Sequence, residues 1–110
     1  MTDTAGAVFS ALADPTRRFV VQCLAERGPT TATALAERLP ITRQAVTKHL
    51  TALSEAGLVD ATREGRETRY RLTPDPFTQA MEWMIGVGAQ WDKRLDALRT
   101  HVERPSRRRS

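Results

Sequence analysis

At 110 residues the chain is long enough for one domain with one modest hydrophobic core, and its composition of 40% apolar residues suits a helical fold. The formal charge is +4, but four arginines within the last seven residues account for all of it, so the sequence predicts a basic tail and not a basic domain. A single cysteine excludes an internal disulfide, and the lack of a signal-peptide core or a run of about 18 apolar residues predicts a soluble, cytoplasmic protein.

The first two predicted elements are short amphipathic helices. The first runs from Ala5 to Ala13, and the residues on its apolar side are Val8, Phe9 and Leu12. The second runs from about Pro15 to Glu26, because Asp14 can cap it, Pro15 suits its first position, and Gly28 with Pro29 stops it. The residues that this second helix is predicted to bury are Phe19, Val20, Cys23 and Leu24.

The only cysteine has two interpretations. Cys23 lies among Val20, Val21 and Leu24, which favours a buried, inert thiol. The alternative is a thiol switch that links two chains.

A third helix is predicted at about Ala32 to Leu39, with Thr30 or Thr31 as its cap. A tight turn at Pro40 and Ile41 leads into a fourth helix, predicted at about residues 42–56 with Thr42 as its cap. Two short helices joined by a turn of a few residues are typical of a helix-turn-helix, in which the second helix reads DNA.

The fourth helix is strongly amphipathic. Its apolar stripe consists of Val46, Leu50 and Leu53. The opposite face consists of Arg43, Gln44, Thr47, Lys48 and Thr51, and no carboxylate occurs until Glu55. Cations, an amide and hydroxyls are the groups that contact base edges and phosphates, so we interpret this face as the DNA-reading surface.

A hairpin is predicted next. Strands at Leu58 to Arg63 and Thr68 to Leu72 flank a turn at Glu64 to Glu67. Tyr70 and Leu72 are expected to face the core, and Arg69 and Arg71 to face outward. A hairpin after a recognition helix is a wing, so the predicted fold is mostly α with a small β wing, a winged helix-turn-helix with a long C-terminal dimerisation helix.

The wing also has two interpretations. Arg63 and Arg66 near its tip are placed to reach a phosphate backbone. Glu64 and Glu67 lie among them, however, so a solvated hairpin with balanced charges is the alternative.

The last helix is predicted at about residues 75–103, with Asp75 as its cap and Pro76 in its first turn. Apolar residues and one glycine recur along it with steps of four and three, which is a heptad seam: Phe77, Met81, Met84, Gly88, Trp91, Leu95, Leu98 and Val102. Gly86 and Gly88 permit close approach of another helix or introduce a break. Trp83 and Ile85 lie off the seam and are expected to pack onto their own domain.

The seam is longer than the small preceding domain can cover, which predicts a homodimer. The residues assigned to the dimer interface are Val8, Phe9, Leu12, Met81, Met84, Trp91, Leu95 and Leu98. The alternative is a helix that folds wholly onto its own chain. Residues 1–103 are interpreted as a single domain, followed by a disordered basic tail at 104–110.

Three stretches resemble the ArsR/SmtB family of bacterial winged-helix repressors: FSALADPTRRFVVQCL, ALAERLPITRQAVTKHLTALSEAGLV and REGRETRYRLTP. The resemblance covers about residues 8–74 and implies a homodimeric transcription factor, usually a repressor that leaves a palindromic operator when an inducer binds. The residues assigned to DNA binding are Thr42, Arg43, Gln44, Thr47, Lys48, His49, Arg63, Arg66 and Arg69. His49 lies beside the apolar stripe and is interpreted as a packing or phosphate-contacting residue.

The sequence departs from the metal sensors of the family that it resembles. Those proteins use paired cysteines before the recognition helix, or Asp and His ligands along the last helix. Here residues 30–38 contain no Cys or His, and the only His of the last helix is His101. Two histidines and one distant cysteine supply too few ligands for a borderline metal, so we expect no metal and no cofactor.

Two other classes of function compete with specific DNA binding. A winged helix that binds proteins without specific DNA recognition is compatible with zero net charge outside the tail. An enzyme has little support, since the sequence lacks a phosphate-binding glycine loop and a His or Cys constellation. The sequence leaves open a small-molecule or protein effector. Met81, Met84 and Trp91 either line a pocket for it or form only apolar core.

Overall fold

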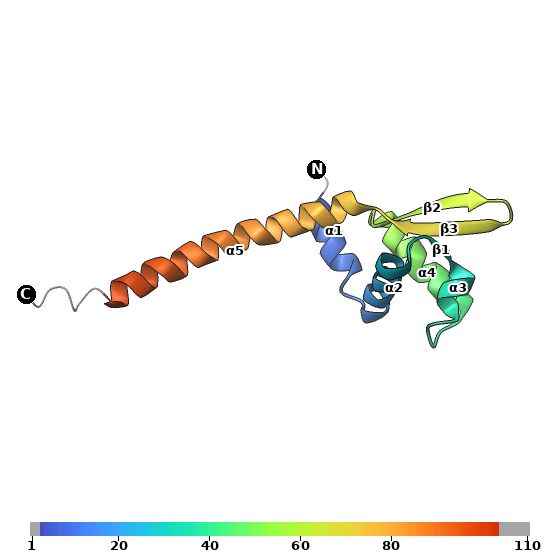
Figure 1. Cartoon of the computed structure of the whole chain (residues 1–110), viewed down its shortest axis with the longest axis horizontal. Coiled ribbons are helices and arrows are strands. Elements are labelled where there is room, and N and C mark those ends of the chain that lie inside the picture. Colours follow the sequence, from blue (N-terminus) through green and yellow to red (C-terminus); the bar gives the residue numbers. More distant parts are fainter. Residues whose placement is uncertain (1–2, 104–110) are drawn as a thin grey trace, which may run out of the picture. The chain divides into compact units, whose positions relative to one another are not determined.

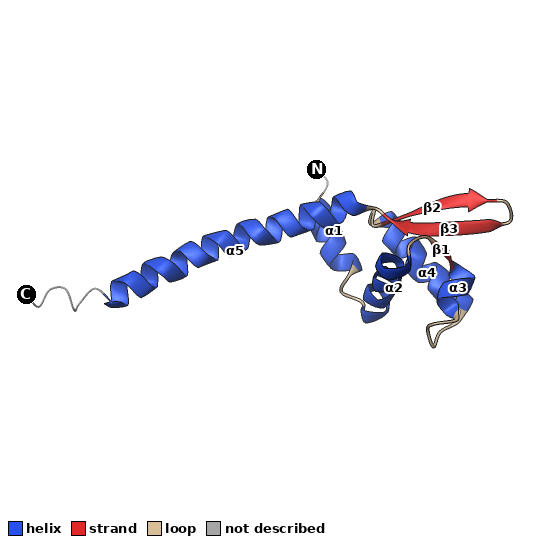
Figure 2. Ribbon diagram, viewed as in Figure 1, coloured by secondary structure: helices blue, strands red, loops and turns tan. Residues whose placement is uncertain are grey.

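The computed structural model describes residues 3–103, and Figure 1 labels its elements. In chain order they are α1 (Thr4–Ala11), α2 (Pro15–Arg27), β1 (Thr30–Thr31), α3 (Ala32–Ala36), α4 (Arg43–Glu55), β2 (Val59–Glu64), β3 (Glu67–Leu72) and α5 (Pro74–Glu103). The fold is mostly α with a small β wing, as predicted (Figure 2). By its contacts the chain divides into two units, 1–80 and 81–110. The predicted basic tail lies outside the described residues.

The helices of the first unit begin where side chains satisfy their first N–H groups. Asp3 caps α1 by accepting from the N–H of Gly6 at 2.9 Å. Asp14 caps α2 by accepting from the N–H groups of Thr16 and Arg17, at 2.7 Å and 3.2 Å. Gly28 ends α2 with a φ of 82°, a conformation that L side chains rarely adopt. The predicted cap and stop of α2 are therefore confirmed.

The third helix is shorter than the sequence predicts. It ends at Ala36 and not at Leu39. Beyond it, the N–H of Arg38 donates to the Leu35 carbonyl at 3.0 Å and that of Leu39 to the Ala36 carbonyl at 3.4 Å, which are bonds of a tighter 3₁₀ type. Pro40 then prevents the helix from resuming, because it disfavours helical backbone at Leu39.

The core of the first unit gathers around α4. α2, α3 and β2 all contact this helix. Its stripe of Val46, Leu50 and Leu53 is fully buried, as predicted. Val20, Leu24 and Leu35 close the core from the neighbouring helices, and Leu58 closes it from the end of the loop after α4. Cys23 is buried at the edge of this core, with 7% of its surface exposed.

Phe19 corrects the prediction for α2. The sequence predicts it in the core, yet it is 47% exposed. Its neighbour Val20 is wholly buried, and two residues next to each other on a helix point about 100° apart. The buried stripe of α2 is therefore narrower than the sequence predicts. It consists of Val20, Cys23 and Leu24.

The wing is part of a three-stranded antiparallel sheet with the order β1-β3-β2 (Figure 2). In the hairpin Val59 pairs with Leu72, Ala61 with Tyr70, and Glu64 with Glu67. Gly65 and Arg66 form the turn, and Gly65 has the positive φ of 64° that such a tight turn requires. The short strand β1 is absent from the sequence prediction, because two residues are too few to show any alternation.

The last helix begins at Pro74. Asp75 lies in its first turn and is not the cap that the sequence predicts, because Pro74 already has the fixed φ that suits a first helical position. The helix continues without interruption through Gly86 and Gly88 to Glu103. Ala80 is buried and Phe77 packs against the core of the first unit, so the first turns of α5 complete that core.

Trp83 and Ile85 are expected from the sequence to pack onto their own domain. Their side chains are 56% and 62% exposed. Both belong to the unit of residues 81–110, whose described part is a single stretch of α5. Together with the seam residues, they place apolar side chains on several sides of this stretch of α5.

Candidate nucleic-acid interface

The outward face of α4 presents the groups that the sequence assigns to it. Arg43, Gln44, Lys48 and Thr51 are exposed, and Thr47 is half-buried. The Thr47 hydroxyl donates to the Arg43 carbonyl at 3.0 Å, and the Thr51 hydroxyl donates to the Thr47 carbonyl at 2.9 Å. Each hydroxyl therefore uses its only proton within the helix and presents acceptor lone pairs and a methyl group outward.

The start of α4 is electrostatically suited to an anion. Thr42 is exposed and caps the helix, with its Oγ1 accepting from the N–H of Ala45 at 3.1 Å. No acidic residue lies in the first turn, so nothing there neutralises the positive end of the helix dipole. A DNA phosphate is the kind of group that this end of a helix attracts.

His49 lies between the outward face and the core and is half-buried. It is close enough to Asp14 for its charge to act on that carboxylate. The pKa of Asp14 is lowered, first by the hydrogen bond from the N–H of Arg17, then by that from Thr16, with smaller contributions from the charges of His49 and Arg17, while burial opposes the shift. His49 thus lies on the side of α4 near the cap of α2, as its position beside the apolar stripe predicts.

The register of the hairpin gives the wing two chemically different faces. Arg63 pairs with Thr68, and Ala61 pairs with Tyr70, so these residues share the face that is turned to the core. Glu64, Glu67 and Arg69 alternate onto the opposite, outer face, although Glu67, beside the turn, also lines the groove described below. The same outer face holds Asp60 and Arg71, whose side chains form an ion pair at 3.4 Å. Because every outer-face arginine has an acidic partner, the unbalanced positive charge lies on the inner face and the tip.

A groove of about 420 Å³ lies between the wing and the helix-turn-helix. Arg43 and Thr47 of α4 line it from one side, and Arg63 and Arg66 of the wing line it from the other. The remaining lining residues are Thr31, Ala32, Thr33, Ala34, Glu37, Glu67, Thr68 and Tyr70. Residues about twenty positions apart in the sequence therefore meet in one concave, polar surface, whose charged residues are three arginines and two glutamates.

Not every predicted DNA-binding residue lines this groove. Thr42, Gln44 and Lys48 are exposed on α4 beside it, whereas Arg69 is on the outer face of the wing. Arg63 also has an internal role, because its Nε donates to the Gly65 carbonyl across the turn at 3.0 Å. The sequence analysis did not assign Thr33 of α3, or Glu37 directly after α3, to this surface. An outward position on the first helix of a helix-turn-helix was the only available signal for them.

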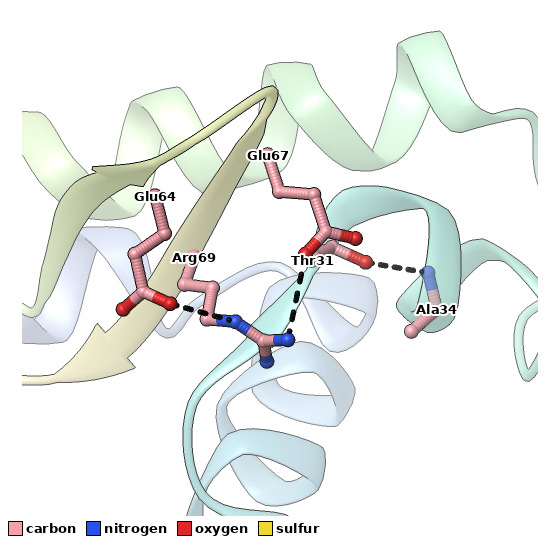
Figure 3. A network of polar contacts seen from close by, with 5 residues as sticks. All are labelled: Thr31, Ala34, Glu64, Glu67 and Arg69. Carbon is pink, nitrogen blue, oxygen red and sulfur yellow. Dashed lines mark hydrogen bonds and ion pairs between the residues drawn. The ribbon is translucent and has the colours of Figure 1, made fainter.

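Arg69 is held by two carboxylates, as Figure 3 shows. Its Nε lies 3.3 Å from Glu64 Oε1, and its Nη2 lies 3.5 Å from Glu67 Oε1. Beside this network the Thr31 hydroxyl accepts from the N–H of Ala34 at 3.1 Å, which caps α3 (Figure 3). The wing is thus joined to the start of the helix-turn-helix through β1, in which Thr31 pairs with Arg69 of β3.

The residues assigned to the dimer interface fall into two groups. Val8 is 2% exposed within the core of its own chain, so its side chain is not available to a second chain. Leu12 packs partly against the core, and Phe9 is 38% exposed. The five residues of α5 assigned to the interface are all exposed large hydrophobics: Met81, Met84, Trp91, Leu95 and Leu98.

Two further features bear on other classes of function. Within residues 3–103, no group of three or more His, Cys, Asp or Glu side chains is arranged to hold a metal ion. No helix in that range is both long enough and apolar enough to cross a membrane.

Comparison with known proteins agrees with this architecture. A family model described as a helix-turn-helix domain matches residues 12–61. The transcriptional regulator YuzN of Bacillus subtilis is 43% identical over 91 residues, covering 77% of this chain and 99% of YuzN. The transcriptional repressor SdpR of the same organism is 32% identical over 88 residues, covering 80% of this chain and 97% of SdpR.

Solved structures show the same likeness. An ArsR-like transcriptional regulator from Rhodococcus sp. RHA1 superposes with a TM-score of 0.77 at 39% identity, covering 91% of this chain and 92% of that one. A homodimeric winged helix-turn-helix DNA-binding domain from Mycobacterium bovis has a TM-score of 0.64 at 28% identity, covering 78% and 80%. The cadmium sensor CmtR of Mycobacterium tuberculosis has a TM-score of 0.53 at 43% identity, covering 61% and 68%.

The relatives that match over nearly their whole length are transcriptional regulators. The chain has a winged helix-turn-helix, with an amphipathic helix and a hairpin on either side of one polar groove. From sequence and fold together, this chain belongs to the ArsR family of winged helix-turn-helix transcriptional regulators.

Proposed function

We propose that this regulator is a homodimeric repressor that binds a palindromic operator through two copies of the groove between α4 and the wing. The observation on which the proposal rests is the convergence of Arg43 and Thr47 with Arg63 and Arg66 on that groove. A duplex that places a major-groove edge on α4 brings its phosphate backbone to the wing. Such a protein works on chromosomal DNA, which places it in the cytoplasm.

Each side chain has a role that follows from its chemistry. Arg43 is a bidentate donor suited to guanine, and Gln44 pairs donor and acceptor as adenine requires. Thr47 offers an acceptor and a methyl group, because its proton is donated to the helix. Lys48, Arg63 and Arg66 hold phosphates. Thr42 receives a phosphate at the start of α4, and His49 contacts the backbone from the side of the helix.

The proposed dimer uses α5 of two chains, with help from Phe9 and Leu12 of α1. The support is the exposure of five large hydrophobic side chains that recur with heptad spacing: Met81, Met84, Trp91, Leu95 and Leu98. A twofold dimer presents two reading helices to successive major grooves, about 34 Å apart. Homodimerisation of the similar Mycobacterium bovis domain, and the naming of SdpR as a repressor, point the same way.

We further propose that no metal controls this repressor. Its soft or borderline ligands are two histidines and the buried Cys23, which lie far apart in the sequence and are a poor supply for a site of three or four ligands. An organic molecule or a protein is left as the effector class. Adding Cd²⁺ or Zn²⁺ to the operator complex should leave it intact, and release at stoichiometric metal would overturn this part of the proposal.

The experiment that tests the proposal is selection of bound sequences from a random DNA pool with purified full-length protein at near-physiological salt. The expected result is a palindromic motif with half-sites one helical turn apart. An unenriched pool, with circular dichroism showing folded protein, would overturn specific DNA binding and favour the protein-interaction module.

A further inference from the structure

The outer face of the wing places two negative charges opposite one another. Glu64 and Glu67 are register partners on β2 and β3, immediately before and after the turn. Like charges at such a position destabilise an antiparallel pair. Arg69 lies two residues after Glu67 on the same face, and its guanidinium bridges both carboxylates (Figure 3). The three side chains together have a net charge of −1.

Arg69 is less exposed than its two acidic partners. The Arg69 side chain is 39% exposed, whereas those of Glu64 and Glu67 are 58% and 59% exposed. Arg69 also belongs to the central strand of the sheet, with Thr62 opposite it on β2 and Thr31 opposite it on β1. Near the tip, the outer face therefore exposes its two carboxylates more than the guanidinium between them.

This arrangement bears on the balance between specific and nonspecific binding. Sequence-independent DNA affinity comes from the number of phosphates that cations neutralise. What matters for a regulator is the ratio of its affinity for the operator to its affinity for nonspecific DNA. Additional phosphate contacts raise the nonspecific affinity without adding base recognition. Exposed ion pairs are weak, so Arg69 is within reach of a phosphate if its acidic partners are removed.

We propose that Glu64 and Glu67 are specificity-determining residues that hold Arg69 away from the phosphate backbone of nonspecific duplex DNA. Phosphate contacts by the wing are thereby limited to Arg63 and Arg66, which line the groove. The inference rests on the proposed function, since it concerns the same DNA interface.

The test compares the wild-type protein with Glu64→Gln/Glu67→Gln, a change that removes both charges and keeps the size of the side chains. Binding to the selected operator and to a scrambled duplex of equal length is measured by fluorescence anisotropy between 50 and 200 mM salt. For the scrambled duplex, the slope of log K against log salt should steepen by about 0.9 for each additional phosphate that is neutralised. Its binding at the lowest salt should tighten about threefold to tenfold, and the ratio of operator to scrambled affinity should fall.

Two controls isolate the groups responsible. Asp60→Asn frees Arg71 from its 3.4 Å ion pair on the same face, four residues or about 13 Å from Glu64 along the strand, and should leave the slope unchanged. Glu64→Gln/Glu67→Gln/Arg69→Ala should restore the wild-type slope. If the double variant is unfolded at the assay temperature and the wild-type protein is folded, Glu67→Gln alone is measured in the same way.

The outcomes separate this inference from the proposed function. The inference is overturned if the double variant has the salt slope and affinity ratio of the wild type, or if it binds the scrambled duplex more weakly. In that case the operator preference of the wild type still stands. If the salt slope of Asp60→Asn steepens as much as that of the double variant, the effect comes from net charge alone. If the slope of the triple variant stays steep, Arg69 is not the source of the additional phosphate contact. Either result overturns the inference. A wild-type protein with no preference for its selected operator overturns the proposed function itself.

Discussion

At the scale of single residues, the arginines of α4 and the wing differ in their surroundings. Arg43 projects from the reading helix, where a guanidinium can pair with one base. Arg66 lies in the turn of the wing and lines the groove, and we propose that it holds a phosphate. Arg69 is withdrawn by two carboxylates. Substitution of each arginine should therefore have a different effect on DNA binding.

Arg43→Ala should lose discrimination at particular base pairs of the operator. The expected loss is about 1 to 3 kcal/mol between the preferred base and its substitutes, because one bidentate pair disappears. Anisotropy titrations with single-base variants of the operator measure it. Unchanged preference at every position would show that the outward face of α4 has been assigned wrongly.

Arg66→Ala should weaken operator and scrambled DNA alike. The salt slope should fall by about 1 for each phosphate that Arg66 neutralises in the wild type, since sequence-independent binding releases counterions. Arg69→Ala is the matched control on the same hairpin, and its slope should remain near the wild-type value. Equal slopes for wild type and Arg66→Ala would exclude a phosphate interaction at the tip.

Asp14 provides a pH-dependent prediction at the same scale. The pKa of Asp14 is lowered from the ordinary 3.8, so its ionised form is favoured in the folded state. A lowered pKa contributes stability that is present above the unfolded value of 3.8 and is lost as the pH falls through the folded value.

Asp14→Asn keeps a capping oxygen but removes the charge. The thermal midpoint of this variant should lie below that of the wild type at pH 6, and the difference should shrink below pH 3.8. Thermal unfolding followed by circular dichroism at several pH values measures it. A difference that stays constant with pH would contradict the role of the charge.

At the scale of elements, α4 combines two requirements in one stretch of sequence. One side of the helix supplies the wholly buried Val46, Leu50 and Leu53 to the core. The other side presents polar groups, and its first turn depends on Thr42 for a hydrogen-bond acceptor. The stability of the reading helix and its geometry at the DNA are therefore coupled through its cap.

Thr42→Ala should lower the free energy of unfolding by about 1 kcal/mol, because the N–H of Ala45 loses its 3.1 Å acceptor. Thr42→Ser retains the hydroxyl and should remain close to the wild type. Equilibrium urea unfolding compares the three proteins. If Ala and Ser variants were equally stable, the capping hydrogen bond would contribute nothing measurable.

At the scale of the whole molecule, the unit of residues 81–110 has large apolar side chains without cover from a second described element of that unit. The exposed seam is the basis of the proposed dimer. Leu95 lies on the seam, whereas Lys93 is two residues away and so points about 200° away around the helix. This pair permits a matched test, because one substitution at either position can lower the net charge by one unit.

Leu95→Glu should convert the dimer to a monomer and weaken operator binding by more than about tenfold, because a charge would be buried in the seam. Lys93→Gln makes the same change in charge on the opposite side and should remain dimeric. Sedimentation equilibrium measures the mass of both. A dimeric Leu95→Glu protein would exclude the seam as the interface.

Much of the molecule was determined by the sequence alone, because its signals are local. Caps, stop residues and periodicity predicted the starts of α2 and α4, the buried stripe of α4, and the hairpin with Tyr70 and Leu72 turned inward. Each of these depends on residues within one or two turns of one another, or on the strict alternation of a strand. The family also follows from local motifs, since the residues that define it form continuous stretches.

Only the tertiary structure decided which residues meet and which stay exposed. The pairing of Thr31 with Arg69, the two carboxylates around that arginine, and the groove that joins Arg43 to Arg66 all connect separate elements. The exposure of Phe19, Trp83 and Ile85 likewise depends on what other elements cover, and not on the period of their own helix. Local sequence specifies the direction of a side chain on its element, whereas its partner is specified by packing between elements.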